Sequence, residues 1–209
     1  MKQTAVLPKD EDIKQLMDSI DRSRFKGARD FAMIYVFYTI GMMVDELINM
    51  KISDVHPELL SVTVGYEKRL VPLKKATYDV LKQYIGTLRS LKDVKLLPDD
   101  EQTLFGRIQD GQYVPVTRQA IHDNLSTRGR KERIKCKITP MTLRNYAITN
   151  YILEGVDQDE IRRMVGFYGS HTMGKYYKMV GRKRPKRKRR YSRHIKTENK
   201  NKIVIAKDA

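Results

Sequence analysis

The sequence predicts a mostly helical α+β fold, in which one helical domain carries a small antiparallel β-sheet and is followed by a basic C-terminal extension. Three observations predict this fold. Several segments of the 209-residue chain repeat apolar residues at helical spacing, whereas residues 62–73 alternate like paired strands. From Gly181 to the end, 13 side chains are basic and two are acidic, with few apolar residues to order them.

Three helices are expected before the sheet. Four apolar residues share one face of the first helix, predicted over residues 8–24: Ile13, Leu16, Met17 and Ile20. Residues 28–40 are apolar on nearly all sides, so this second helix is expected to be buried in the core and to end at Gly41. A third helix is expected over residues 44–50.

Residues 62–73 predict a β-hairpin that bends at residues 65–67. A helix over 75–91 and a loop-rich stretch over 92–112 are expected next, with Leu104 and Phe105 as a buried strand or turn. Four more helices complete the expected domain: 117–125, 139–154, 157–165 and 170–180. Residues 202–206 have the composition of a short terminal strand.

Charge is the strongest signal in the composition. Lys and Arg number 42 against 25 acidic residues, a formal net charge of +17, so a polyanion is the expected partner. No apolar run approaches the ~18–20 residues of a membrane span, and the N-terminus lacks the apolar stretch of a secretory signal. Cys136 stands alone and forms no internal disulfide. These features favour a cytoplasmic protein of a bacterial, archaeal or phage-infected cell, with no membrane partner, no cofactor and no metal.

Four segments occur in an order that resembles one family. They are RDFAMIYVFYTIGMMVDELINMKISDV (29–55), VTVGYEKRLVPL (62–73), ITPMTLRNYAITNYILEGVDQDEIRRMVGF (138–167) and GSHTMGKYYKMV (169–180). Together they resemble the two boxes, the β-hairpin and the nucleophile segment of the tyrosine recombinase (phage integrase) family, over roughly residues 6–180. The resemblance implies that family's catalytic-domain fold, with double-stranded DNA as the partner.

In that family a tyrosine attacks the scissile phosphodiester and forms a covalent 3′-phosphotyrosine. Two arginines neutralise the transition-state charge, and a lysine with histidines or a tryptophan transfers protons. The resemblance assigns one of the arginines to Arg144. By its spacing to Val180 the tyrosine is Tyr177, with Tyr176 as the alternative, and Lys68 at the hairpin bend is the candidate lysine.

Five other family positions carry residues without the required chemistry. They are Met43 at the first arginine, Val64 at the hairpin lysine, Met141 and Asn145 at the histidines of the second box, and Phe167 at the last histidine or tryptophan. Because Met43, Met141 and Phe167 are apolar, we expect them to fill the former site as core residues. Arg144 is then expected either to contact phosphate or to pair with Glu46 or Asp45.

These replacements predict a DNA-binding protein with a degenerate active site that acts as a repressor-like regulator or an accessory factor. Tyr177 would then have a packing role. The alternative is a divergent, active recombinase that cleaves and rejoins DNA through Tyr177, Arg144 and Lys68, with His171 replacing a lost histidine. The aromatic-rich sequences of common RNA-binding modules are absent from the chain.

DNA-contacting residues are expected in two basic groups. They are Arg128, Arg130, Lys131, Arg133, Lys135 and Lys137 in the first, and Arg182, Lys183, Arg184, Lys186, Arg187, Lys188, Arg189 and Arg190 in the second. The expected organisation is a recombinase-like domain over residues 1–180, a basic flexible arm over 181–200 and a terminal segment over 201–209. An apolar strand at the end of such an arm suits docking on a sheet edge, which is a route to a homo-oligomer.

Overall fold

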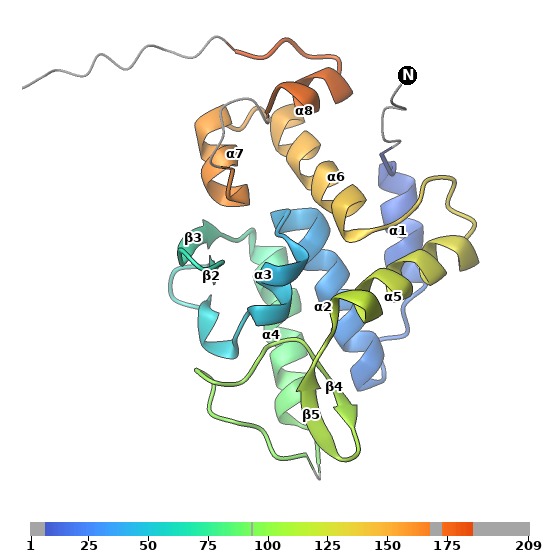
Figure 1. Ribbon diagram of the computed structural model, residues 1–209, viewed down its shortest axis with the longest axis vertical. Helices are drawn as coiled ribbons and strands as arrows, with labels where there is room; N and C mark the ends of the chain where they lie inside the picture. The colour runs from blue at the N-terminus through green and yellow to red at the C-terminus, as the bar shows by residue number, and fades with distance from the viewer. Residues whose placement is uncertain (1–6, 93, 168–172, 186–209) are drawn as a thin grey trace, which may run out of the picture.

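The computed structural model describes residues 7–92, 94–167 and 173–185 (Figure 1). The helices are α1 (Asp10–Asp18), α2 (Phe25–Ile40), α3 (Val44–Asn49), the 3-10 helix η1 (Ile52–Asp54), α4 (Lys75–Arg89), α5 (Arg118–Lys131), α6 (Pro140–Leu153), α7 (Gln158–Val165) and α8 (Met173–Met179). The strands are β1 (Val55–His56), β2 (Ser61–Val64), β3 (Arg69–Pro72), β4 (Gly106–Gln109) and β5 (Gln112–Pro115). The predicted class, a mostly helical domain with small antiparallel sheets, is confirmed.

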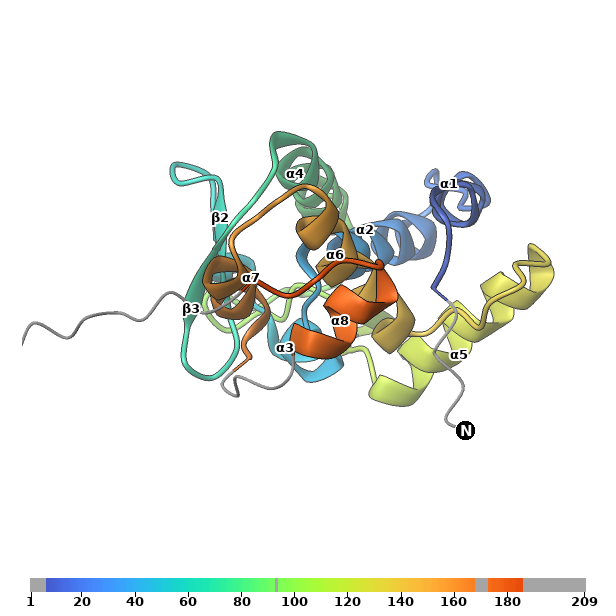
Figure 2. The same ribbon diagram turned by 90° about the horizontal axis from the view of Figure 1, so that it is seen from above.

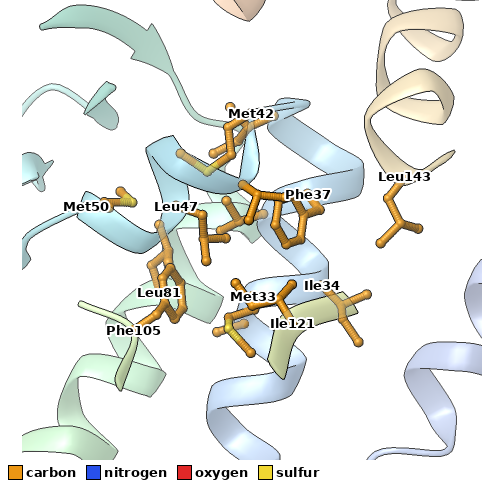
Figure 3. Close-up of a cluster of buried hydrophobic side chains, with 14 of the residues drawn as sticks. Met33, Ile34, Phe37, Met42, Leu47, Met50, Leu81, Phe105, Ile121 and Leu143 are labelled. Carbon is orange, nitrogen blue, oxygen red and sulfur yellow. The ribbon is translucent and has the colours of Figure 1, made fainter. Parts of the chain in front are cut away.

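Helix α2 is the centre of the core, as its apolar composition predicts. It packs against α4 and α6, and the view from above shows α3, α5 and α8 on one side of it with α4 on the other (Figure 2). Met33 and Phe37 of α2 meet Leu47 of α3 and Leu81 of α4 in a buried cluster (Figure 3). The helix ends at Gly41, whose φ of 73° is the left-handed conformation that glycine adopts without strain.

The predicted hairpin forms two strands of an antiparallel sheet with the order β1-β2-β3. Val62 of β2 pairs with Val55 of β1 on one side and with Val71 of β3 on the other, and all three valines are buried. The bend between β2 and β3 occupies residues 65–68. Strand β3 packs against α7, and a Cβ atom at Gly65 in the bend would lie 3.2 Å from Glu46 Oε1 of α3, where the site described below begins.

A second hairpin, β4–β5, was not predicted, because residues 106–112 were expected to be loop. Its four-residue strands pair antiparallel around Asp110 and Gly111, and nearly all their side chains are exposed or half-buried. Strands of this kind have no apolar face to reveal their alternation in the sequence. Leu104 and Phe105, which precede the hairpin, are fully buried as expected.

Two helix boundaries also differ from the prediction. Helix α1 ends at Asp18 rather than Arg24, because the Ser19 hydroxyl donates to the carbonyl of Leu16 and closes the last turn. Helix α5 continues to Lys131 rather than stopping at residue 125, so the first residues of the expected basic loop are helical. Residues 170–172 of the last predicted helix, and the predicted strand at 202–206, lie outside the described residues.

A smaller apolar cluster joins α6, α7 and α8 above the main core. Asp157 starts α7 by accepting hydrogen bonds from the backbone amides of Asp159 and Glu160. Gly155, with φ of 81°, turns the chain just before it. Among the helices in the described part of the chain, none has both the length and the hydropathy to cross a membrane.

Candidate functional site

Arg144 is the centre of the candidate site. Helix α6 fixes its position, since Thr139 caps the helix start by accepting from the amide of Thr142, and Pro140 occupies the first turn. The Arg144 side chain is 4% exposed. One guanidinium nitrogen donates to the carbonyl of Gly41 at the end of α2, and the other donates to the carbonyl of Val165 at the end of α7, over 2.6 Å. The guanidinium therefore joins three helices.

Aromatic rings cover the same guanidinium. The Arg144 Cζ atom lies 5.0 Å from the centre of the Phe167 ring, and the Tyr176 ring stacks on Phe167 with 5.7 Å between centroids. Burial lowers the pKa of Arg144, while the charge of Glu46 and the nearby Tyr176 hydroxyl raise it. Arg144 keeps its charge in this surrounding, because an arginine remains protonated in proteins.

A second arginine, Arg69 of β3, lies beside Arg144. Its Nη1 forms an ion pair with Glu46 Oε1 over 2.7 Å, and its Nε donates to the carbonyl of Met164 over 3.1 Å. The carbonyls of Met164 and Val165, consecutive at the end of α7, thus bind one arginine each. Within the described part of the chain, Arg69 Nη2 is buried without a hydrogen-bond partner.

Glu46 and two glycines complete this arrangement. The second carboxylate oxygen of Glu46 accepts from the backbone amide of Met43 over 2.7 Å, which caps α3. A Cβ atom at Gly65 or Gly166 would lie 2.7 or 2.9 Å from Arg69 Nη1, so only glycine leaves room for the guanidinium. Arg69 was not predicted as a site residue, and Glu46 pairs with Arg69 rather than with Arg144. The conspicuous signal was an arginine in a predicted hairpin strand of otherwise apolar residues.

The two candidate tyrosines face different surroundings. Tyr176 is 1% exposed and lies over Phe167, on the Arg144 side of α8. Tyr177 is buried in the smaller cluster, where burial and then the charge of Asp157 raise its pKa, while Arg184 and Arg182 lower it. The structure therefore brings Tyr176, rather than Tyr177, close to Arg144.

The expectation that methionines fill the former site is wrong. Met43 is 44% exposed and Met141 is 56% exposed, because the first lies at the N-cap of α3 and the second in the first turn of α6. Phe167, half-buried against Arg144, and Val64, 2% exposed, do pack inward. The two exposed methionines therefore do not fill a pocket in the core.

The positions of Arg144, Lys68 and Asn145 decide three other expectations about the site. Arg144 does not pair with an acid, since Glu46 binds Arg69 and Asp45 binds Arg118. Lys68 is exposed in the turn, at a φ of 47°, and does not point inward. Asn145 is 5% exposed on α6. His171 lies outside the described residues.

The first basic group forms a continuous surface. After α5, exposed and buried residues alternate, so Arg133, Lys135 and Lys137 face solvent while the intervening apolar residues enter the core. Arg130 and Lys131 at the end of α5 are exposed as well. Arg128 differs, since it is held inside by an ion pair with Asp30.

The second basic group begins at the other end of α6. Arg182 donates to the carbonyls of Ile152 and Leu153, and Arg184 donates to Gln158, so both already have partners in the fold. Lys183 is exposed. The remaining members of this group lie outside the described residues: Lys186, Arg187, Lys188, Arg189 and Arg190. Because α6 has 14 residues, the two groups are separated by roughly 20 Å along it.

Comparison with known proteins agrees with this geometry. Residues 7–182 match the model of the phage integrase family. The tyrosine recombinase XerD of Staphylococcus aureus (strain N315) is 31% identical over 159 residues, which are 75% of this chain and 52% of that protein. The XerD of Listeria innocua is 31% identical over 172 residues, 79% of this chain and 56% of that protein. The chain spans about half the length of these relatives.

Solved structures have the same fold. The XerA recombinase superposes with a TM-score of 0.71 at 24% identity, covering 89% of this chain and 66% of its own. The XerH site-specific recombinase, solved in a post-cleavage complex with a palindromic difH substrate, gives a TM-score of 0.69 at 19% identity, covering 85% and 50%.

Proposed function

The chain belongs to the phage integrase family, and from that premise we propose that it binds double-stranded DNA without cleaving it. It acts as a repressor-like regulator or as an accessory factor at a DNA site. One observation carries the proposal. Arg144, the arginine that the resemblance assigns to phosphate, is 4% exposed and donates to two backbone carbonyls.

The chemistry of strand cleavage requires more than this arginine supplies. A pentavalent phosphorus transition state spreads negative charge over its oxygens, and loss of one positioned donor costs about 10²–10³ in rate. Met43 and Met141 carry uncharged thioethers at the positions where the resemblance implies an arginine and a histidine. The guanidinium also lies against the Phe167 ring, on which the Tyr176 ring stacks.

DNA binding has independent support from charge and exposure. The net charge is +17, and Arg133, Lys135 and Lys137 form a row of exposed cations that alternate with buried residues along the chain. Regularly spaced cations of this kind bind phosphates and release condensed counterions. The similar XerH and Tn1549 integrase structures contain DNA, which supports the same partner for this chain.

A test of DNA binding uses this row directly. Changing Lys135 and Lys137 to Ala should lower the slope of log K against log salt for a random-sequence duplex by roughly 2, because each lost phosphate contact removes about 0.9. Lys82→Ala, an exposed lysine of α4, is the matched control and should leave the slope unchanged. An equal change in both variants would remove this row from the DNA interface.

A test of catalysis separates binding from cleavage. The protein is incubated with fragmented source DNA, quenched with SDS, and the DNA that stays attached is compared with the DNA bound natively. We expect native binding and full release by SDS. An SDS-resistant adduct that disappears in Tyr176→Phe or Tyr177→Phe, but persists in the control Tyr66→Phe, would instead establish an active recombinase.

Two further parts of the proposal concern the assembled protein. Residues 181–200 serve as a basic arm, and the apolar segment 201–209, outside the described residues, docks on a second copy to give a homo-oligomer in the cytoplasm. The test measures the molar mass of the double variant Ile203→Asp, Ile205→Asp by light scattering after size-exclusion chromatography. A mass equal to that of the unsubstituted chain would contradict the docking role.

A further inference from the structure

A cleft of about 780 Å³ lies between the start of α2, the β4–β5 hairpin and α5. It is separate from the Arg144 site, since none of the residues around that guanidinium lines it. Figure 1 shows the three elements meeting at the lower right of the domain. A volume of this size is in the range of about 300–1,000 Å³ that binding sites occupy.

The floor of the cleft is apolar. Met33 of α2 and Ile121 of α5 meet there (Figure 3), with Phe25 and Val116 beside them. Ile108 of β4 stands at the edge and leaves 44% of its surface exposed. Such a floor gains free energy when an apolar side chain covers it, at roughly 25 cal/mol per Å².

The rim of the cleft is cationic. Five basic side chains line it against one carboxylate, that of Asp123: Lys26, Arg29, Arg107, Arg128 and Lys131. Lys26, Arg107 and Lys131 are exposed and free to turn toward an occupant. An acidic group in the cleft would therefore meet cations from α2, β4 and α5 at once.

The two inner arginines are fixed by a buried acid. Asp30 is fully buried, and its Oδ1 accepts from Arg29 Nε and Nη2 over 3.0 and 2.7 Å. Its Oδ2 accepts from Arg128 Nη2 over 3.0 Å and from Asn124 over 2.7 Å. Because two arginines share one carboxylate, the wall retains a positive charge that is positioned before any ligand arrives.

We propose that this cleft docks an acidic amphipathic segment of a partner protein, with apolar side chains on the floor and carboxylates at the rim. Charge complementarity selects this occupant over the chain's own last residues, since 201–209 contain two lysines and one aspartate. The apolar side chains that the cleft leaves accessible, Phe25 and Ile108, select it over DNA, because a phosphate backbone offers no apolar group to cover them. The inference does not depend on the proposed DNA-binding function.

The experiment measures fluorescence anisotropy of a labelled model peptide with the full-length protein. The peptide has roughly 12 residues, about 18 Å as a helix, with leucines at i, i+3, i+4 and i+7 and glutamates elsewhere. Its matched analogues replace every glutamate by glutamine or every leucine by serine. We expect the parent peptide to bind at least about tenfold more tightly than either analogue, which is about 1.4 kcal/mol.

Substitutions then locate the site. Arg107→Glu and Ile108→Asp alter exposed side chains of the hairpin, so folding should persist, and circular dichroism checks this. Each should weaken the parent peptide about tenfold or more, whereas Lys82→Glu on α4 should change it less than about twofold.

Other outcomes overturn the proposal. No binding of the parent peptide, equal weakening by Lys82→Glu, or equal binding of the serine analogue would each do so. Tighter binding of a synthetic 201–209 peptide would assign the cleft to the chain's own end. Competition by duplex DNA that Arg107→Glu and Ile108→Asp both abolish would assign it to DNA. None of these readouts depends on whether the protein cleaves DNA.

Discussion

Replacing Arg144 with methionine tests whether this arginine belongs to the architecture or to a phosphate site. Methionine has a similar length without branching, so it fills most of the same volume and leaves little cavity. What it removes is the pair of hydrogen bonds to the carbonyls of Gly41 and Val165, together with the positive charge against the Phe167 ring. Both carbonyls close helices, and both then lack their side-chain donor.

The size of the effect follows from those two bonds. A hydrogen bond from a charged donor contributes about 1.5–3 kcal/mol, so two give roughly 3–6 kcal/mol of lost folding free energy. For a domain of this size, each kcal/mol lowers Tm by about 2–4 °C. The expected decrease in Tm is therefore roughly 6–24 °C.

The assay is urea denaturation followed by circular dichroism, with DNA affinity measured on the folded fraction. Arg130→Met is the matched control, because Arg130 lies exposed on α5, and it should lose less than about 0.5 kcal/mol. If Arg144→Met kept its stability within about 1 kcal/mol but lost DNA binding, the reasoning would be refuted. Arg144 would then be available to phosphate, and the carbonyl contacts would be incidental.

Three other substitutions and reactions test the fold around the two sites. Asp30→Asn should lower the free energy of unfolding by about 3–5 kcal/mol, because two arginines lose the charge of a buried carboxylate. Urea denaturation measures this loss, with Asp123→Asn as the control because the Asp123 carboxylate is exposed. Gly41→Ala should cost more than Gly155→Ala. Both glycines have a positive φ, which costs a residue with a side chain about 1–2 kcal/mol. Only at Gly41 would the added Cβ atom contact a neighbour, the Cβ of Ala147 at 3.1 Å. Differential scanning calorimetry measures the difference in stability. Cys136 should react with a thiol reagent at pH 8 at least about tenfold more slowly in the folded protein than in the urea-unfolded protein. The reason is that burial raises the pKa of the Cys136 thiol above its ordinary value and so lowers the fraction of thiolate. Equal reaction rates would contradict the buried position.

Local sequence patterns identified the elements that have strong apolar periodicity. The run over residues 28–40 gave α2, and the valines of residues 62–73 gave the β2–β3 hairpin. The β4–β5 hairpin was not predicted because its side chains are mostly exposed. Asp110 and Gly111 were then its only sequence signal, and they indicate a turn rather than strands. Alternation of apolar and polar residues reports which side chains are buried, so a strand with few buried side chains shows little alternation in its sequence.

The site was predicted less completely than the fold, for a physical reason. A motif can assign Arg144 to a position on α6, but its partners come from α2 and α7, far away in the sequence. The ion pair of Glu46 with Arg69 is likewise decided by tertiary packing. Exposure of Met43 and Met141 follows from their places at helix starts, which residue type alone does not disclose.

The choice between Tyr176 and Tyr177 shows the same limit at the scale of one residue. Adjacent residues on a helix point about 100° apart, so a shift of one position in the alignment exchanges the two surroundings. In the structure, one tyrosine lies over Phe167 beside Arg144, and the other lies in the cluster near Asp157. Spacing to Val180 selected Tyr177, whereas packing selects Tyr176 as the tyrosine nearer the arginine.

The position of Arg144 also changes how a retained motif residue is interpreted. An arginine that only contacted phosphate would have no further role where the other catalytic positions carry uncharged residues. Here Arg144 also joins the ends of α2 and α7 through two carbonyls, and it lies under Phe167. These contacts give Arg144 a structural role that does not depend on strand cleavage. Retention of Arg144 is therefore no sign by itself that strand cleavage is retained.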